Sequence, residues 1–183
     1  TPLTVKLSRA REEYHRAERE EHGLAGKIER YESAMQLCEE VENYIKREGL
    51  QKQSIEYEKM YMEAVRFWGV TAQRAEEVRR GFFDGDVVYL QGLPEEDPEV
   101  NALAGRKKEA LSKETLEKGM RKLEEAIKLM RSGRPLMDHP KQLIGALSAL
   151  GRMKAFFIGG TEGIKRGIEN IKEAMREAAN FGE

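Results

Sequence analysis

One of the three histidines stands at a spacing from a carboxylate that suits metal binding. Glu12 and His15 are three residues apart, so a helix would place both side chains on one face. His22 follows two turns after His15. A carboxylate and an imidazole on one face can share a metal ion. Many charged residues surround this pair and no second E-x-x-H exists, so we predict a solvated helix face here, with no metal and no cofactor.

Arg134 and His139 form an R-x4-H pattern, a second candidate for chemistry. It resembles the active motif of HEPN-type RNases, all-α proteins that use an Arg and a His to cut RNA. In that family the motif lies on a helix, whereas Pro135 and Pro140 predict a loop here. The other interpretation is a connector in which His139 or Asp138 caps the following helix.

Two further motifs resemble larger families over a few residues. The Glu12–His15 spacing is similar to that of ferritin-like di-iron bundles, which need matching acidic ligands inside four helices. The run 158–165, IGGTEGIK, resembles the G-x-x-G loop of KH domains, which lies next to phosphates. Its apolar residues are out of register with that family, Glu162 would oppose phosphate, and the strands of a KH fold are missing. We interpret the run as a corner between helices with Thr161 as N-cap.

Basic residues in the C-terminal third are candidates for phosphate contacts. They would converge if the last two helices form a hairpin. The overall balance of 32 Lys and Arg against 33 Asp and Glu argues against a broadly basic surface for duplex nucleic acid. Solvated helix faces are the alternative interpretation. The four residues are Arg152, Lys154, Lys165 and Arg166.

An unbroken 3-4 spacing through the first third of the chain predicts a long helix over about 4–47. A period near 3.5 over about six heptads is typical of a helix that packs lengthwise on another helix. Gly23 and Gly26 mark a bend or a close approach, and Gly49 suits a left-handed helix end. The positions are Leu3, Leu7, Ala10, Tyr14, Ala17, Glu21, Leu24, Ile28, Tyr31, Met35, Cys38, Glu42 and Ile45.

A second periodic segment over about 51–82 predicts the other arm of an antiparallel hairpin. Its seam includes Tyr57, Tyr61 and Trp68. If the turn lies near Gly49, Tyr31 should lie beside Trp68, Ile45 near Ser54 and Leu24 near Ala75.

The remainder of the chain predicts a loop followed by shorter helices. Residues 84–97 carry turn chemistry and a short β-branched and aromatic run at 87–90, which predicts an extended piece. The fold is therefore predicted to be all-α, with a coiled-coil-like helical hairpin over 1–83, a linker over 84–97 and a small helical bundle over 98–183. The expected faces of the last three helices are Leu116, Met120, Leu123, Ile127 and Met130, then Leu143, Ile144, Leu147, Leu150, Phe156 and Phe157, then Ile164, Ile168, Ile171, Met175, Ala178 and Phe181.

Composition restricts the class of protein. The one cysteine, Cys38, offers no intramolecular disulfide, so the chain fits a reducing compartment, the cytoplasm, or a virion if its origin is viral. No apolar run approaches the roughly 18 residues of a membrane span, so we expect no membrane partner. No small-molecule substrate is apparent.

The leading functional hypothesis is a non-enzymatic structural or assembly protein. Aromatic side chains on the long helices exceed what a bare two-helix hairpin can bury, so a second copy, a helical partner or the C-terminal bundle must cover them. The candidate interface residues are Tyr57, Met60, Tyr61, Phe67, Trp68, Val87 and Tyr89. The alternatives are a nucleic-acid-binding packaging or coat protein of a virus or mobile element, and a HEPN-like RNase.

Overall fold

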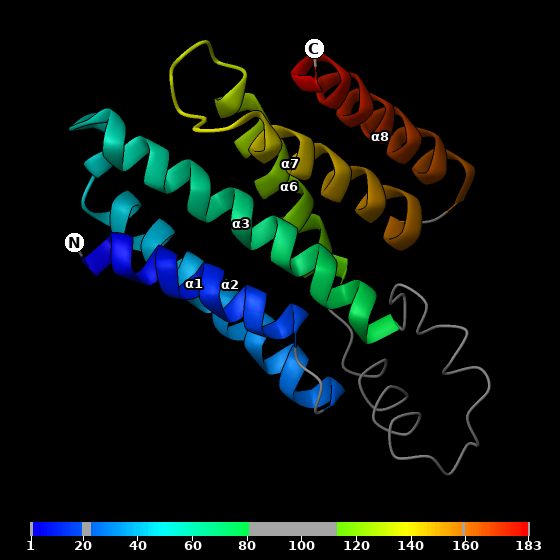
Figure 1. Ribbon diagram of the computed structural model, residues 1–183, viewed down its shortest axis with the longest axis horizontal. Helices are drawn as coiled ribbons and strands as arrows, with labels where there is room; N and C mark the ends of the chain where they lie inside the picture. Colours follow the sequence, from blue (N-terminus) through cyan, green and yellow to red (C-terminus); the bar gives the residue numbers. More distant parts are fainter. Residues whose placement is uncertain (1, 20–22, 81–112, 159, 183) are drawn as a thin grey trace.

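The computed structural model describes residues 2–19, 23–80, 113–158 and 160–182, and this part of the chain is all-α, as predicted. In Figure 1 the helices succeed one another from α1 and α2 through α3 and α7 to α8, and α6 lies behind α3 and α7. The predicted extended piece at 87–90 and linker at 84–97 lie outside the described residues. The elements are α1 (Pro2–Glu18), α2 (Leu24–Arg47), the 3-10 turn η1 (Leu50–Lys52), α3 (Ile55–Arg80), α6 (Lys113–Met130), α7 (Pro140–Met153), the π-helical turn η2 (Lys154–Ile158) and α8 (Gly160–Gly182).

The predicted single helix over 4–47 is wrong, because the chain turns back on itself between α1 and α2. Gly23 stands at the start of α2 with a φ of 129°, a backbone conformation that favours glycine. Lys6 pairs with Glu40 at 3.3 Å and Arg30 with Glu13 at 3.4 Å, which is an antiparallel arrangement. A continuous helix and a pair of antiparallel helices can bury the same 3-4 positions, so the periodicity alone could not distinguish them.

Helices α2 and α3 form the predicted antiparallel hairpin. Gly49 follows the C-cap of α2 in the left-handed conformation, with a φ of 62°, as its position indicated. The predicted register is wrong by about two helical turns, because Tyr31 clusters with Ala75 and Val78 instead of Trp68. The turn η1 lengthens the connection, so the paired positions move toward the C-terminal end of α3.

The predicted face of α6 is confirmed: Leu116, Met120, Leu123, Ile127 and Met130 are all buried. This face packs against α3 and α7. Gly133, three residues after the end of α6, has a φ of 84°, in the left-handed region that favours glycine.

Helix α7 begins with a capping box. His139 Nδ1 accepts a hydrogen bond from the Lys141 amide at 3.1 Å, and the Gln142 side chain accepts one from the His139 amide at 3.1 Å. Pro140 occupies the first turn, where its missing N–H removes no helical hydrogen bond. This confirms the interpretation of the stretch before α7 as a connector with a capping histidine.

Glycines bring α7 and α8 into close contact. A Cβ at Gly151 would lie 2.6 Å from the carbonyl oxygen of Gly167, and one at Gly163 would lie 2.7 Å from the carbonyl oxygen of Lys154. Gly145, which also lies on α7, is different: a Cβ there would meet one Arg66 nitrogen at 4.0 Å. The crowded glycines are therefore needed for packing, whereas Gly145 has no such need among the described residues.

Ionic contacts join the N-terminal helices to α3. Glu18 of α1 accepts hydrogen bonds from Tyr31 of α2 at 2.5 Å and from Arg74 of α3 at 2.9 Å. Burial alone would raise the pKa of the Glu18 carboxyl, but the hydrogen bonds from Arg74 and Tyr31 and the charge of Arg74 outweigh it and lower this pKa. The ionised form of Glu18 therefore stabilises the junction of three helices.

Gly151 is crowded by α8 and Gly145 is not, so replacement by alanine should affect stability differently at the two positions. Gly151→Ala should lower the free energy of unfolding by about 1–3 kcal/mol, because the methyl group cannot fit against α8. Gly145→Ala should leave it unchanged or raise it by up to about 1 kcal/mol, because the helix gains propensity at no steric cost. Urea denaturation of both variants measures the difference. Equal destabilisation by both substitutions would contradict the glycine contact.

The lowered pKa of Glu18 predicts a pH-dependent role. A carboxyl whose folded pKa is depressed stabilises the protein above its ordinary value of 4.5, and this contribution is lost as pH falls through the lower folded value. Glu18→Gln should therefore destabilise the protein by about 1 kcal/mol at neutral pH. The gap to the wild type should close as pH falls below 4.5.

Urea denaturation across pH 3–7 tests this, with Glu12→Gln as the control at an exposed ion pair with Arg16. A Glu18→Gln gap that stays constant with pH would show that the carboxylate charge is not responsible.

Candidate functional site

The aromatic residues predicted to form an interface are largely covered within one chain. Tyr61, Phe67 and Trp68 are buried, and Tyr57 and Met60 are half-buried against the same core. The Tyr61 hydroxyl donates to Glu125 of α6 at 2.6 Å, and Lys118 and Lys122 of α6 each lie 5.2 Å from the Trp68 ring centroid. Of the three ways to cover these side chains, the structure shows the C-terminal helices. Val87 and Tyr89 lie outside the described residues.

The four candidate phosphate contacts do not form one surface. Lys154 and Arg166 line a pocket of about 280 Å³ between α6 and α8, together with Arg121 but also Glu117 and Glu124. Lys154 lies 3.9 Å from Glu124, so its charge faces a carboxylate.

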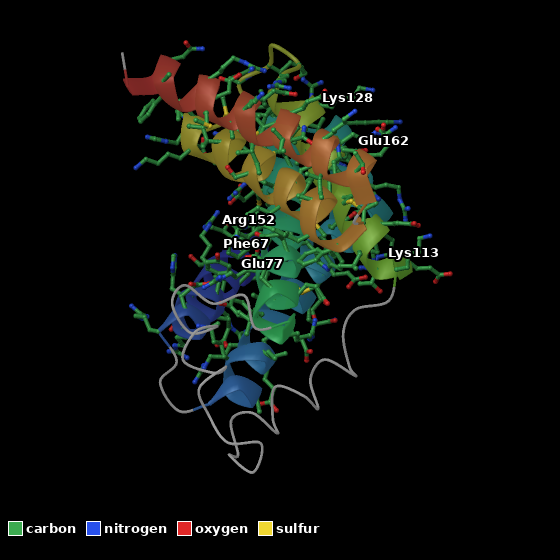
Figure 2. All side chains as sticks on the ribbon, turned by 90° about the vertical axis from the view of Figure 1, so that its right-hand side faces the viewer. Phe67, Glu77, Lys113, Lys128, Arg152 and Glu162 are labelled. Carbon is green, nitrogen blue, oxygen red and sulfur yellow. The ribbon has the colours of Figure 1, made fainter. Side chains whose placement is uncertain are left out.

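Arg152 contacts a different helix. Its Nε donates to Glu77 of α3 at 2.6 Å, and Figure 2 shows the two side chains together. Arg166 lies 3.9 Å from Glu162, and Lys165 is exposed. Three of the four cations therefore face a carboxylate.

Arg134 and His139 are also engaged within the chain. Arg134 pairs with Glu58 at the start of α3. His139 caps α7, and its ring meets the Phe181 ring edge to face at 4.9 Å between centroids. The two side chains therefore have separate structural partners.

The remaining candidates for chemistry lie in structural surroundings. Glu12 pairs with Arg16 at 2.5 Å, and His15 meets the Tyr14 ring edge to face. His22 lies outside the described residues. Burial raises the pKa of the Cys38 thiol to about 12, which keeps it protonated and unreactive. Within residues 2–19, 23–80, 113–158 and 160–182 no cluster of His, Cys, Asp and Glu side chains could hold a metal ion.

The corner before α8 is a packing feature. Gly160 has a φ of 70° and begins α8, one residue before the predicted N-cap Thr161. Gly163 packs on the backbone of η2. The G-x-x-G run at 160–163 thus packs α8 against η2, and Gly159, the residue before it, lies outside the described residues.

The main unpartnered apolar surface lies on α8. Of the nine exposed large apolar side chains in the described part of the chain, six fall between Phe156 and Phe181. Three of them lie at helical spacing on α8: Ile164 is 48% exposed, Ile168 44% and Met175 66%. Ile171, half-buried, continues the same line. We call Ile164, Ile168, Ile171 and Met175 the α8 apolar row.

The contacts of α8 fix the direction of this row. Gly167 faces Gly151 of α7 and Gly163 faces η2, while Glu173 and Glu177 pair with Arg131, just after the end of α6, at 3.1 and 3.6 Å. At about 3.6 residues per turn, the α8 apolar row lies roughly opposite the two glutamates. The row therefore points away from α6, on a helix at one edge of the described array of helices (Figure 1).

The apolar residues of this surface could be recognised in the sequence, but their periodic spacing suggested a buried face. The predicted face of α8 included every member of the row, and a periodic apolar face is normally a buried one. In the structure the neighbouring glycines pack against α7 and η2, so the larger side chains of the α8 apolar row remain exposed.

Comparisons with protein families, with curated proteins and with solved structures found no match to this chain. Among the described residues no helix is long and apolar enough to cross a membrane.

The burial of Trp68 predicts a purely internal role for this side chain. Trp68→Ala should lower the free energy of unfolding by about 3–5 kcal/mol, because it opens a cavity between α3 and α6. It should leave the mass in solution unchanged, as measured by light scattering. Tyr44→Ala, at an exposed aromatic of α2, should change stability by about 0.5 kcal/mol or less. If Trp68→Ala abolished an oligomer without lowering the free energy of unfolding, the prediction would be wrong and Trp68 would belong to an interface between chains.

Proposed function

We propose that this chain is a non-enzymatic assembly protein that binds another helical protein surface through the α8 apolar row. The observation that carries the proposal is the exposure of Ile164, Ile168 and Met175 in one line on an outer helix. Burying apolar area is favourable by about 25 cal/mol per Å², so a line of half-exposed side chains is a source of binding free energy. Contiguous exposed apolar patches mark interaction sites more often than scattered single residues do.

The rest of the molecule supports this choice of surface. The aromatic residues of α3 are covered by α6 and α7, so they need no partner. The α8 apolar row has no equivalent cover among the described residues, although the helix beneath it packs tightly on α7.

The rival functions have weaker support. An RNase site would need Arg134 and His139 to meet at a substrate, but they contact Glu58 and Phe181 instead. A phosphate-binding surface would need several free cations close together, but Arg152 is bound to the buried Glu77, Lys154 lies near Glu124 and the exposed Arg166 lies near Glu162. Neither arrangement favours chemistry or nucleic acid over protein binding.

A charge-matched pair of variants tests the proposal. Ile168→Asp places one negative charge in the row, and Asn180→Asp places one at an exposed position of α8 outside it. We expect Ile168→Asp to abolish association and Asn180→Asp to retain it, with both variants as stable as the wild type in urea. Light scattering measures self-association, and quantitative capture from native cell extract measures retained proteins. An identical mass and identical retained proteins for Ile168→Asp and the wild type would refute the function.

A further inference from the structure

The spacing of the α8 apolar row is that of a coiled-coil seam. Ile164, Ile168, Ile171 and Met175 are separated by four, three and four residues, and Ala178 continues the series. The adjacent arc of α8, with Gly163, Gly167 and Ala174, is buried. A seam this narrow suits one partner helix lying along it. A helix that lies in a membrane surface shows a broad apolar face instead.

A basic edge borders this seam on the solvent side. Lys165 and Lys172 are seven residues apart and occupy the flanking positions that choose partners in coiled coils. Arg176 lies one step further around the helix. All three are exposed, and within the described ranges no carboxylate lies at ion-pair distance from them. The basic edge is thus available to a partner.

The other charges near the seam do not cancel this edge. On α7, Arg152 is half-buried and paired with the buried Glu77 of α3. On α8, Glu169 lies beyond the basic edge, away from the seam. Glu162 approaches Arg166, and Glu173 and Glu177 face Arg131 on the α6 side.

A second copy of α8 would fit this seam poorly. In an antiparallel pair the same flank of each helix meets, so lysine would oppose lysine. In a parallel pair, Lys165 and Lys172 would face the flank that holds Gly167 and Ala174, which α7 already covers. Like charges across helices are destabilising.

We propose, on the basis of the function above, that the partner is an acidic amphipathic helix that packs on the α8 apolar row and places carboxylates against Lys165 and Lys172. Its apolar residues fill the seam and supply most of the affinity. Its flanking glutamates or aspartates supply the selectivity and make binding sensitive to salt.

Two designed three-heptad peptides test this inference on the full chain. They share one apolar seam, and one carries Glu and the other Lys at the flanking positions. Fluorescence anisotropy should show the Glu peptide binding about tenfold more tightly than the Lys peptide, with the difference shrinking at high salt. The double variant Lys165→Glu, Lys172→Glu should reverse the preference. Ile168→Asp should abolish binding of both peptides, whereas Asn180→Asp should not.

The outcomes separate this inference from the proposed function. Equal binding of both peptides, lost in Ile168→Asp, would keep the docking seam and overturn the acidic partner. Binding of the Glu peptide that survives Ile168→Asp would overturn the seam itself, and so would binding of neither peptide.

Two further measurements test the rival occupants. Binding of the wild type, but not of Ile168→Asp, to vesicles of phosphatidylserine and phosphatidylcholine would replace the partner helix with an anionic membrane. An Ile168-dependent dimer in light scattering would replace it with a second copy.

Discussion

The position of α3 between the N-terminal helices and the C-terminal helices is the constraint on which the whole structure depends. One part of its surface packs on α2, and others pack on α6 and α7. A helix surrounded in this way must bury most of its circumference, and this is why Tyr61, Met62 and Phe67 are all buried although they point in different directions around the helix. The apolar side chains on several sides of this helix therefore have a cause within the chain.

Burial on several sides also forces charged residues of α3 into the interior, where each needs a partner. Glu63 accepts from Arg66 and from Gln142 of α7, and Glu77 accepts from Arg152 of the same helix. Buried pairs of this kind contribute little net stability, but an incorrect arrangement of the helices would leave their charges unpaired. The charged partners thus help to select one packing of the helices, and one of them, Glu77, binds Arg152, a residue that the sequence analysis named as a phosphate contact.

The sequence predicted the helical class, the buried face of α6, the cap and start of α7 and the left-handed glycine after α2 because each depends on local spacing or on one residue type. It indicated a bend or a close approach at Gly23 but not a reversal of the chain, because two antiparallel helices can bury the same seam as one long helix. The register of α2 on α3 depends on the length of a connection that contains a short 3-10 turn. The candidate site was missed for a related reason: periodicity identifies an apolar face but does not state what lies against it.

The packing of α8 shows why one of its apolar faces is buried and the other is exposed. The helix carries a small face, with Gly163 and Gly167, and beside it the larger α8 apolar row. Because Gly151 of α7 is also small, the two backbones approach until a single added methyl group would collide. Turning the row inward would exchange this close contact for one in which branched side chains hold the helices apart, and dispersion contacts fall steeply with such a gap. The close contact of the backbones is thus the physical reason that α8 keeps its larger apolar side chains on the outside, next to a basic edge.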